Sequence, residues 1–245
     1  MRWRSCRSSS STGREPTIRS VRVRPYRPTS RFVEGYRDGV PRPAAARDRI
    51  LDTAERLVLQ RGFAATTVDA VLEDAGASKG AFFHHFPTKA ALGRALVERY
   101  AAADADLLES QMRAAEQASD DPAEQLLLFV RGFESAATAA VEAQPACLFV
   151  SFIYEAELTD PATSDLVRAS IAEWRARIGD KLRAASASRP HLADHDIDAV
   201  ADHVFATFEG AFLLVRAEGD PQHMARQLAV LRHHLELLLG APAST

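Results

Sequence analysis

The sequence has very little cysteine and no long hydrophobic run. Its two cysteines, Cys6 and Cys147, are far apart and form neither a C-x-x-C pair nor a Cys/His pattern with zinc-ligand spacing. This composition excludes a disulfide framework and predicts a reduced protein. No apolar stretch approaches the roughly 18 residues that a transmembrane helix requires, and the N-terminus lacks the apolar core of a secretory signal. We therefore expect a soluble cytoplasmic protein with no membrane segment.

Alternating β-strand patterns are also missing. From Ala44 onward alanine, leucine, arginine and glutamate dominate, and apolar residues recur at helical spacing. Prolines at 145, 161, 190 and 221 separate the later segments. These patterns predict an all-α fold, with C-terminal helices near residues 122–143, 146–158, 162–186, 195–217 and 221–240.

Charge is unevenly distributed along the chain. The net charge of −3 combines +8 in residues 1–43, +1 in residues 44–100 and −12 in residues 101–245. Residues 1–43 are rich in arginine, serine and proline, which predicts a disordered basic extension. This extension is either an arm that grips phosphates, an unstructured tail, or upstream sequence included through a misassigned start. Because the first hundred residues are net positive, net charge does not exclude nucleic-acid binding.

Residues 44–92 contain the start and stop signals of three helices. Gly62 is expected to end the first, and Thr67 and Ser78 are natural N-caps for the second and third, with a turn at Gly76 between them. Pro87 must end the third helix, because the residue before a proline is excluded from the α region. Two short helices joined by a glycine turn, about 20 residues in total, have the dimensions of a helix-turn-helix. A fourth helix is expected from residue 89 to beyond residue 107.

The third helix has two aromatic faces. At about 100° per residue, Phe82 and Phe86 share one face, whereas Gly80, Phe83 and His84 cluster on the opposite one. We predict that the first pair is buried and that the second group faces outward. An exposed phenylalanine is unfavourable unless it meets a partner surface.

The residue types of the outward group are suited to contacts with DNA. Lys79 and Lys89 stand at helix starts, where free amides suit a phosphate, Phe83 suits a thymine methyl or a sugar, and His84 suits a base edge or a phosphate. The alternative is that this short aromatic helix is simply core. His84 and His85 point about 100° apart on a helix, which disfavours a shared metal ion.

The run RDRILDTAERLVLQRGFAATTVDAVLEDAGASKGAFFHHFPTKAAL, from Arg47 to Leu92, resembles the N-terminal DNA-binding domain of the TetR/AcrR family of transcriptional regulators. The similarity includes the G-[FY]-x-x-T-T helix junction, the G-x-S-K-G turn, the aromatic-His-His-Phe recognition helix and the [ST]-K that follows. It implies that these residues meet operator DNA: Thr67, Ser78, Lys79, Gly80, Phe83, His84, His85 and Lys89. The family most often has tyrosine where this chain has Phe83, which has no hydroxyl to bond a phosphate.

The resemblance also implies a homodimer whose C-terminal domain, residues 93–245, binds a small-molecule effector. Two recognition helices about 34 to 36 Å apart would then read an inverted-repeat operator. Two apolar stripes favour such a dimer through a four-helix bundle, although they are also able to pack inside one monomer. The stripes are Ile197, Val200, Val204, Phe208, Ala211, Phe212 and Val215, and Met224, Leu228, Leu231, Leu235, Leu238 and Leu239.

Residues 145–158 are apolar around almost the whole predicted helix, which predicts that other helices surround it on all sides. With aromatic residues elsewhere it is expected to enclose a cavity for a largely apolar effector, with Ser151, Tyr154 or His203 as polar groups. The alternative is plain core. The predicted ligand-binding residues are Phe129, Phe133, Phe149, Phe152, Tyr154, Trp174, His203 and Phe208.

The remaining motifs favour neither metal binding nor catalysis. His191 and His195 are four residues apart, but Pro190 and nearby aspartates favour helix capping over a metal site. No Ser-His-Asp arrangement, phosphate loop or cofactor fingerprint is recognisable, so we expect no cofactor, no metal and no enzymatic activity. The sequence therefore predicts a ligand-responsive DNA-binding repressor. The alternative function is a helical small-molecule binding protein or an enzyme that uses the C-terminal cavity.

Overall fold

The computed structural model describes residues 46–144 and 146–240, and within these ranges every regular element is a helix. The predicted all-α fold is confirmed. The predicted basic extension, residues 1–43, lies outside the described residues, as do residues 44–45, 145 and 241–245.

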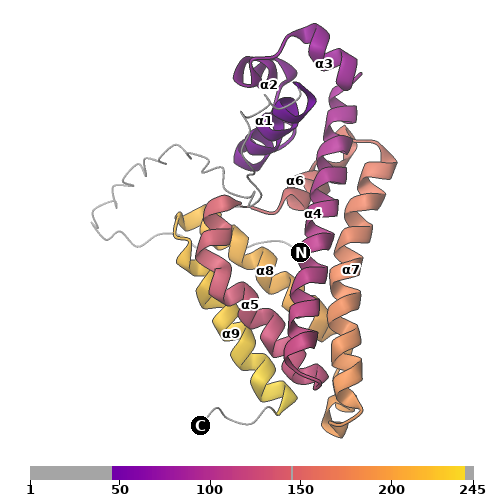
Figure 1. Ribbon diagram of the computed structural model, residues 1–245, viewed down its shortest axis with the longest axis vertical. Helices are drawn as coiled ribbons and strands as arrows, with labels where there is room; N and C mark the ends of the chain where they lie inside the picture. Colours follow the sequence, from indigo (N-terminus) through magenta and orange to yellow (C-terminus); the bar gives the residue numbers. More distant parts are fainter. Residues whose placement is uncertain (1–45, 145, 241–245) are drawn as a thin grey trace, which may run out of the picture.

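Three helices form a cluster at one end of the long axis (Figure 1): α1 (Ala46–Arg61), α2 (Val68–Ala75) and α3 (Lys79–His85). The ends of these helices follow the predicted signals. Gly62, at a φ of +84°, donates from its amide to the Val58 carbonyl at 2.8 Å and closes α1. Thr67 and Ser78 accept from the amides three residues on, at 3.2 and 3.1 Å, and so start α2 and α3.

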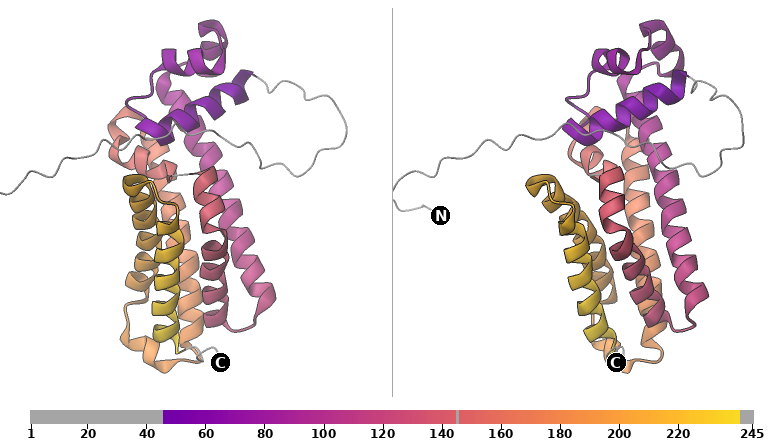
Figure 2. Two further views of the ribbon diagram at one scale, coloured as in Figure 1. Left: turned by 90° about the vertical axis from the view of Figure 1, so that its left-hand side faces the viewer. Right: turned by 60° about the vertical axis from the view of Figure 1, so that its left-hand side comes forward.

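The long helix α4 (Lys89–Ala118) leads from this cluster into a bundle of helices that run broadly along the same axis (Figures 1 and 2). The bundle consists of α5 (Pro122–Ala143), α7 (Pro161–Ser186), α8 (Ile197–Glu218) and α9 (Gln222–Leu239) together with α4. The short α6 (Leu148–Tyr154) lies where the bundle meets the cluster. Two 3-10 turns, η1 (Ala156–Leu158) and η2 (Pro190–Asp194), follow α6 and α7.

One predicted helix is wrong in length and in its surroundings. The helix expected over residues 146–158 ends at Tyr154, because Glu155 leaves the helical region with φ −118° and ψ 27°. Ile153 and Tyr154 are 48% and 85% exposed, so other helices do not surround α6 on all sides. Only one face of α6, carrying Leu148, Phe149 and Phe152, is buried.

The buried residues form two cores that share α4. The first core contains residues of α1, α2 and α3, the first part of α4 as far as Ala101, the α6 face, and Val167 of α7. The second core contains α4 from Leu108 onward together with α5, α7, α8 and α9. The first core therefore extends beyond residue 92, because α6 packs against the helix-turn-helix.

The two C-terminal apolar stripes pack inside the monomer. Val204 and Phe208 of α8, and Leu228 and Leu235 of α9, are buried in the second core, where α5 and α7 already cover these faces. Packing inside one monomer, the alternative given above, describes most of both stripes, although Ile197, Val200, Phe212 and Leu238 are only partly buried there. The more exposed faces of α8 and α9 remain available to a partner.

Candidate DNA interface and ligand cavity

The third helix, α3, presents the predicted aromatic pattern. Phe82 and Phe86 are 0% and 2% exposed, whereas Phe83 is 52% exposed and His84 is exposed. The Phe83 ring stands edge-on to Phe82, with 5.2 Å between the ring centroids. The predicted orientation of the helix is therefore confirmed. His85, which the family resemblance placed among the DNA-contacting residues, is half-buried beside Phe86.

The start of α3 is open. A Cβ added at Gly80 would meet only the Ser78 hydroxyl, at 3.8 Å, so no neighbour within the protein requires a glycine there. Lys79 Nζ lies 3.1 Å from Asp69 Oδ1, and both side chains are more than two-thirds exposed. Thr67 is also exposed. These residues form one accessible surface across the N-terminal ends of α2 and α3.

Lys89 differs from Lys79. Its ammonium group turns inward, donates to the Ala64 carbonyl at 3.0 Å and lies 4.6 Å from the centre of the Phe63 ring. Burial lowers the pKa of Lys89, partly offset by the nearby Glu155 carboxylate. This contact is not predictable from the sequence, because Ala64 lies in a loop 25 residues away.

The eight residues predicted to bind a ligand do not share one place. Phe129, Phe133, Trp174 and Phe208 form one cluster, with neighbouring ring centroids 5.1 to 6.0 Å apart. Phe149 and Phe152 belong instead to the first core, in contact with Tyr100 and Phe63 respectively. Tyr154 and His203 are exposed at the surface.

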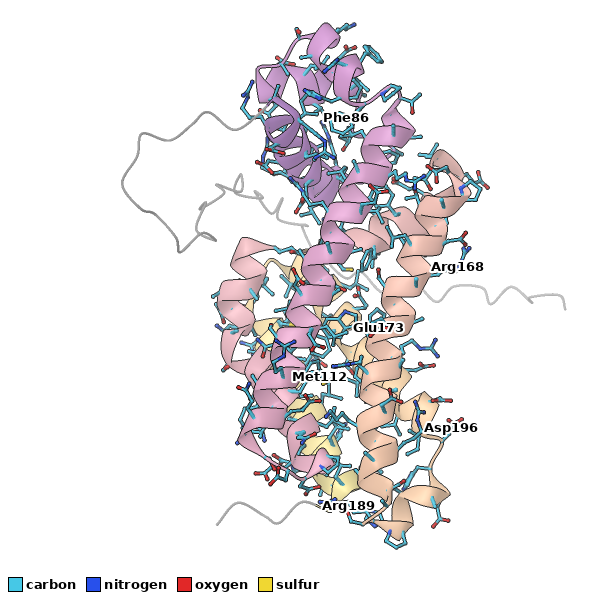
Figure 3. The ribbon with its side chains drawn as sticks, turned by 45° about the vertical axis from the view of Figure 1, so that its right-hand side comes forward. Phe86, Met112, Arg168, Glu173, Arg189 and Asp196 are labelled. Carbon is cyan, nitrogen blue, oxygen red and sulfur yellow. The ribbon has the colours of Figure 1, made fainter. Side chains whose placement is uncertain are left out.

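A cavity of about 440 Å³ lies between α4 and α7. Of the eight predicted residues, only Trp174 lines it; Glu173, another lining residue, is labelled on α7 in Figure 3. Most of the wall is small and apolar, and three carboxylates interrupt it. The lining residues are Glu98, Ala101, Ala102, Asp104, Ala105, Leu108, Leu166, Ala169, Ser170, Glu173 and Trp174.

Asp104 is a charged residue of this cavity that sequence reasoning missed, as it missed every other lining residue except Trp174. Trp174 Nε1 donates to Asp104 Oδ2 at 2.7 Å, and burial raises the pKa of Asp104 to about 6, an effect that the indole hydrogen bond partly opposes. A signal was present in the sequence. Asp104 lies between Ala101 and Leu108 on the buried stripe of α4, where an apolar residue is expected.

Further polar groups are buried next to this cavity. Gln144 donates to the Tyr100 hydroxyl at 2.6 Å, and burial raises the pKa values of Tyr100, Cys147 and Glu209. The neighbouring Glu209 also raises the pKa of the Cys147 thiol. A buried thiol with a raised pKa is a poor nucleophile. This cluster brings polar groups of α4, the start of α6 and α8 close together.

Family comparisons agree with this geometry. Residues 50–96 match a family model described as "Bacterial regulatory proteins, tetR family", and residues 122–231 match a "Tetracyclin repressor-like, C-terminal domain". The chain is 31% identical to the transcriptional regulator AcuR of Cereibacter sphaeroides over 188 residues, which cover 76% of this chain and 84% of AcuR. The chain belongs to the TetR family.

Identity to another TetR family member is higher over a shorter stretch. Identity to the HTH-type transcriptional repressor NemR of Escherichia coli is 44%, but over 57 residues only, 23% of this chain and 29% of NemR. A crystal structure of a regulatory protein TetR from Rhodobacter sphaeroides aligns with a TM-score of 0.64 and 26% identity, covering 77% of this chain and 98% of the other. Its coverage extends the likeness to the whole helical architecture.

The described residues of this TetR family member do not gather into a metal site. Within residues 46–144 and 146–240, no group of three or more His, Cys, Asp or Glu side chains is placed to hold a metal ion. His191 instead contacts the Leu238 carbonyl at 2.9 Å, and Asp196 caps α8 by accepting from the Ala199 amide at 3.1 Å. Among the helices that the structure describes, none is both long and apolar enough to span a bilayer.

Proposed function

We propose that the protein is a cytoplasmic repressor that binds an inverted-repeat operator as a homodimer and is released by a small-molecule effector. One observation supports its DNA-binding role above the others. Phe63, Phe82 and Phe86 are buried in the DNA-binding domain, yet Phe83 is half-exposed at the tip, next to His84. A major-groove surface gives this phenylalanine a partner.

The proposed contacts follow from exposure. Lys79 and the hydroxyls of Thr67 and Ser78 face the phosphates, Gly80 allows the DNA backbone to approach, and Phe83 meets a thymine methyl or a sugar. His84 reads a base edge, and the half-buried His85 supports it, with the two rings 4.9 Å apart.

Lys89 has a different place in this proposal. Its ammonium group would have to leave the Ala64 carbonyl to reach a phosphate. We therefore propose that Lys89 holds the α1–α2 loop against α4. The first amides of α4 then serve the phosphate instead.

The proposed dimer uses the outward faces of α8 and α9, which lie side by side along one flank of the bundle (Figure 2). Leu213 and Leu237 are 67% and 69% exposed, and Leu214 and Val230 are 37% and 49% exposed. Apolar side chains of this size on adjacent helices fit a second copy of the same surface. Leu213→Glu combined with Leu237→Glu is expected to give monomers in sedimentation, with the fold retained in circular dichroism. A variant that stays dimeric would place the interface elsewhere.

The proposed effector site is the cavity between α4 and α7. Its wall of alanines and leucines suits a largely apolar molecule. The helix α4 connects the cavity at Ala101–Leu108 directly to the helix-turn-helix at Lys89. An effector that binds the DNA-incompetent state better, by about 1 to 3 kcal/mol, lowers operator affinity about 5 to 150-fold.

The decisive experiment measures DNA binding. Full-length protein is used to select duplexes from a random-sequence pool, and the enriched sequence is then measured by gel shift beside the promoter of its own gene. We expect an inverted repeat, with His84→Ala changing the preferred bases and His195→Ala, a substitution far from α3, changing nothing. Failure to enrich any sequence at low salt would contradict the proposal.

A further inference from the structure

The loop between α1 and α2, residues 62–67, is held by side chains from distant parts of the chain. Arg216 of α8 donates to the Leu59 carbonyl at 2.6 Å and to the Gln60 carbonyl at 2.8 Å. These carbonyls belong to the last turn of α1, where the helix has no partners of its own and carries the negative end of its dipole. A guanidinium group is well suited to both.

Glu155, at the junction of α6 and η1, contacts the same loop as a hydrogen-bond acceptor, whereas Arg216 is a donor. Its carboxylate accepts from the Ala64 amide at 2.6 Å. A Cβ added at Gly62 would lie 2.7 Å from Glu155 Oε1, so the missing side chain of Gly62 makes room for this carboxylate. Lys89 completes the arrangement by donating to the Ala64 carbonyl.

Glu155 and Arg216, which contact this loop, lie on or next to the same helices as Cys147 and Glu209 of the buried polar cluster. Cys147 occupies the N-cap position of α6 without a side-chain capping bond, and Glu155 follows the last residue of the helix. Glu209 and Arg216 are seven residues apart on α8, which places them on about the same face. Glu209 lies close enough to Cys147 to raise the pKa of its thiol, so α6 and α8 come together at this pair as well as at the C-terminal end of α1 and the loop after it, which Arg216 and Glu155 contact.

Apolar packing makes the junction stiff. The rings of Phe63 in the loop and Phe152 in α6 lie 4.9 Å apart. A Cβ at Gly93 of α4 would be 2.7 Å from Phe63 and 3.2 Å from Phe152. Little free space therefore surrounds these rings. If α6 shifts relative to α8, the α1–α2 loop must move with it.

We infer that Glu155 and Arg216, placed on either side of Gly62, form a clasp through which the effector domain sets the orientation of the DNA-reading helices. They are positioning residues, because neither is placed to touch DNA or the cavity. The inference rests on the proposed function. It adds a specific connection, through α6 and α8, to the path along α4.

The test uses reciprocity, since DNA must act on the effector domain as strongly as the effector domain acts on DNA. The full-length protein is compared by amide hydrogen exchange with and without the duplex selected from the random pool. In the wild type we expect that DNA slows exchange in residues 148–154 and 209–218 by about fivefold or more. In Arg216→Ala and Glu155→Ala we expect this change to vanish there, while residues 79–85 remain protected.

The matched control is Arg226→Ala. Arg226 is an exposed arginine of α9 whose partner is Asp220, at 3.2 Å, and it does not reach α1. This control should respond to DNA as the wild type does. If Arg216→Ala does not fold, Arg216→Lys decides instead, because lysine keeps the charge but reaches fewer carbonyls and should transmit a reduced change.

Two results would overturn the clasp. One is a wild-type protein that binds its selected duplex without any change in residues 148–154 and 209–218. The other is a folded Arg216→Ala or Arg216→Lys variant in which the change is as large as in the wild type. Both leave DNA binding intact, whereas failure of the proposed function appears earlier, as a pool in which no sequence is enriched.

Discussion

The two ends of the molecule differ in how their contacts relate to the sequence. At the DNA-binding end, each helix begins at a side-chain cap or ends at a glycine within a few residues, and the faces of α3 follow from the spacing of its phenylalanines. At the effector-binding end, most helices are long, and many of their contacts join helices far apart in the sequence, such as α5 and α9. The difference shows that nearby residues determine how a helix is oriented only where few other packing arrangements are possible.

The largest effect is expected from the two neighbouring phenylalanines of α3. Phe82→Ala removes a fully buried ring and should lower the free energy of unfolding by about 3 to 5 kcal/mol. Phe83→Ala, one residue on, should change it by less than about 0.5 kcal/mol but weaken operator binding. Urea unfolding and gel shifts measure both. Equal destabilisation by the two variants would contradict the assignment of the faces.

At the other end, Asp104 predicts how stability depends on pH. Its pKa in the folded state, about 6, is above its ordinary value of 3.8. The carboxyl group is therefore better tolerated when protonated, and its favourable contribution is present below pH 3.8 and lost as the pH rises through about 6. This difference corresponds to about 3 kcal/mol.

Asp104→Asn should remove that loss of stability between pH 4 and pH 7, as measured by thermal unfolding. Trp174→Phe removes the hydrogen bond that lowers the pKa, so its loss should extend to a higher pH. A wild-type profile identical to that of Asp104→Asn would show that the carboxyl group is better solvated than its burial indicates.

The two lysines of the helix-turn-helix sharpen the contrast between contacts to DNA and contacts within the protein. Lys79→Ala should reduce affinity for all DNA sequences and lower the slope of log affinity against log salt by about 1. Lys89→Ala should leave that slope nearly unchanged and lower the free energy of unfolding by about 1 kcal/mol, because the Ala64 carbonyl loses its donor. If Lys89→Ala lowers this slope as much as Lys79→Ala does, the ammonium group of Lys89 turns outward on DNA.

The smallest effect is expected at Gly80. Gly80→Ala fits the protein without a clash and should stabilise α3 by up to about 1 kcal/mol. If the DNA backbone approaches this position, the same substitution should weaken operator binding. Thermal unfolding and gel shifts on one preparation test both parts, and tighter binding together with higher stability would remove Gly80 from the interface.

Much of the fold was predictable, whereas the candidate cavity mostly was not. The caps at Thr67, Ser78 and Thr88 depend on residues three positions away, so the sequence contains both partners within one turn. Trp174 was recognised as an aromatic residue facing inward, but its partner Asp104 lies 70 residues earlier. Such pairings depend on which faces of the long helices meet.

The end of α6 is a clear example of this limit. Its composition predicted a longer helix, but Glu155 leaves the helix where it bonds to the Ala64 amide, 91 residues earlier in the chain. The outward leucines of α8 and α9 were missed for a related reason. The stronger apolar stripes drew attention to the faces that fill the monomer's own core.

The packing of α6 against the helix-turn-helix has a consequence for protein engineering. A hybrid regulator that joins residues 46–118 of this protein to the sensor half of a relative would separate Phe63 from Phe152 and Ala64 from Glu155. Such a graft would carry the recognition helix intact and still present it at the wrong angle. A functional hybrid therefore requires that the α6–η1 segment be transferred together with the DNA-binding helices α1 to α3.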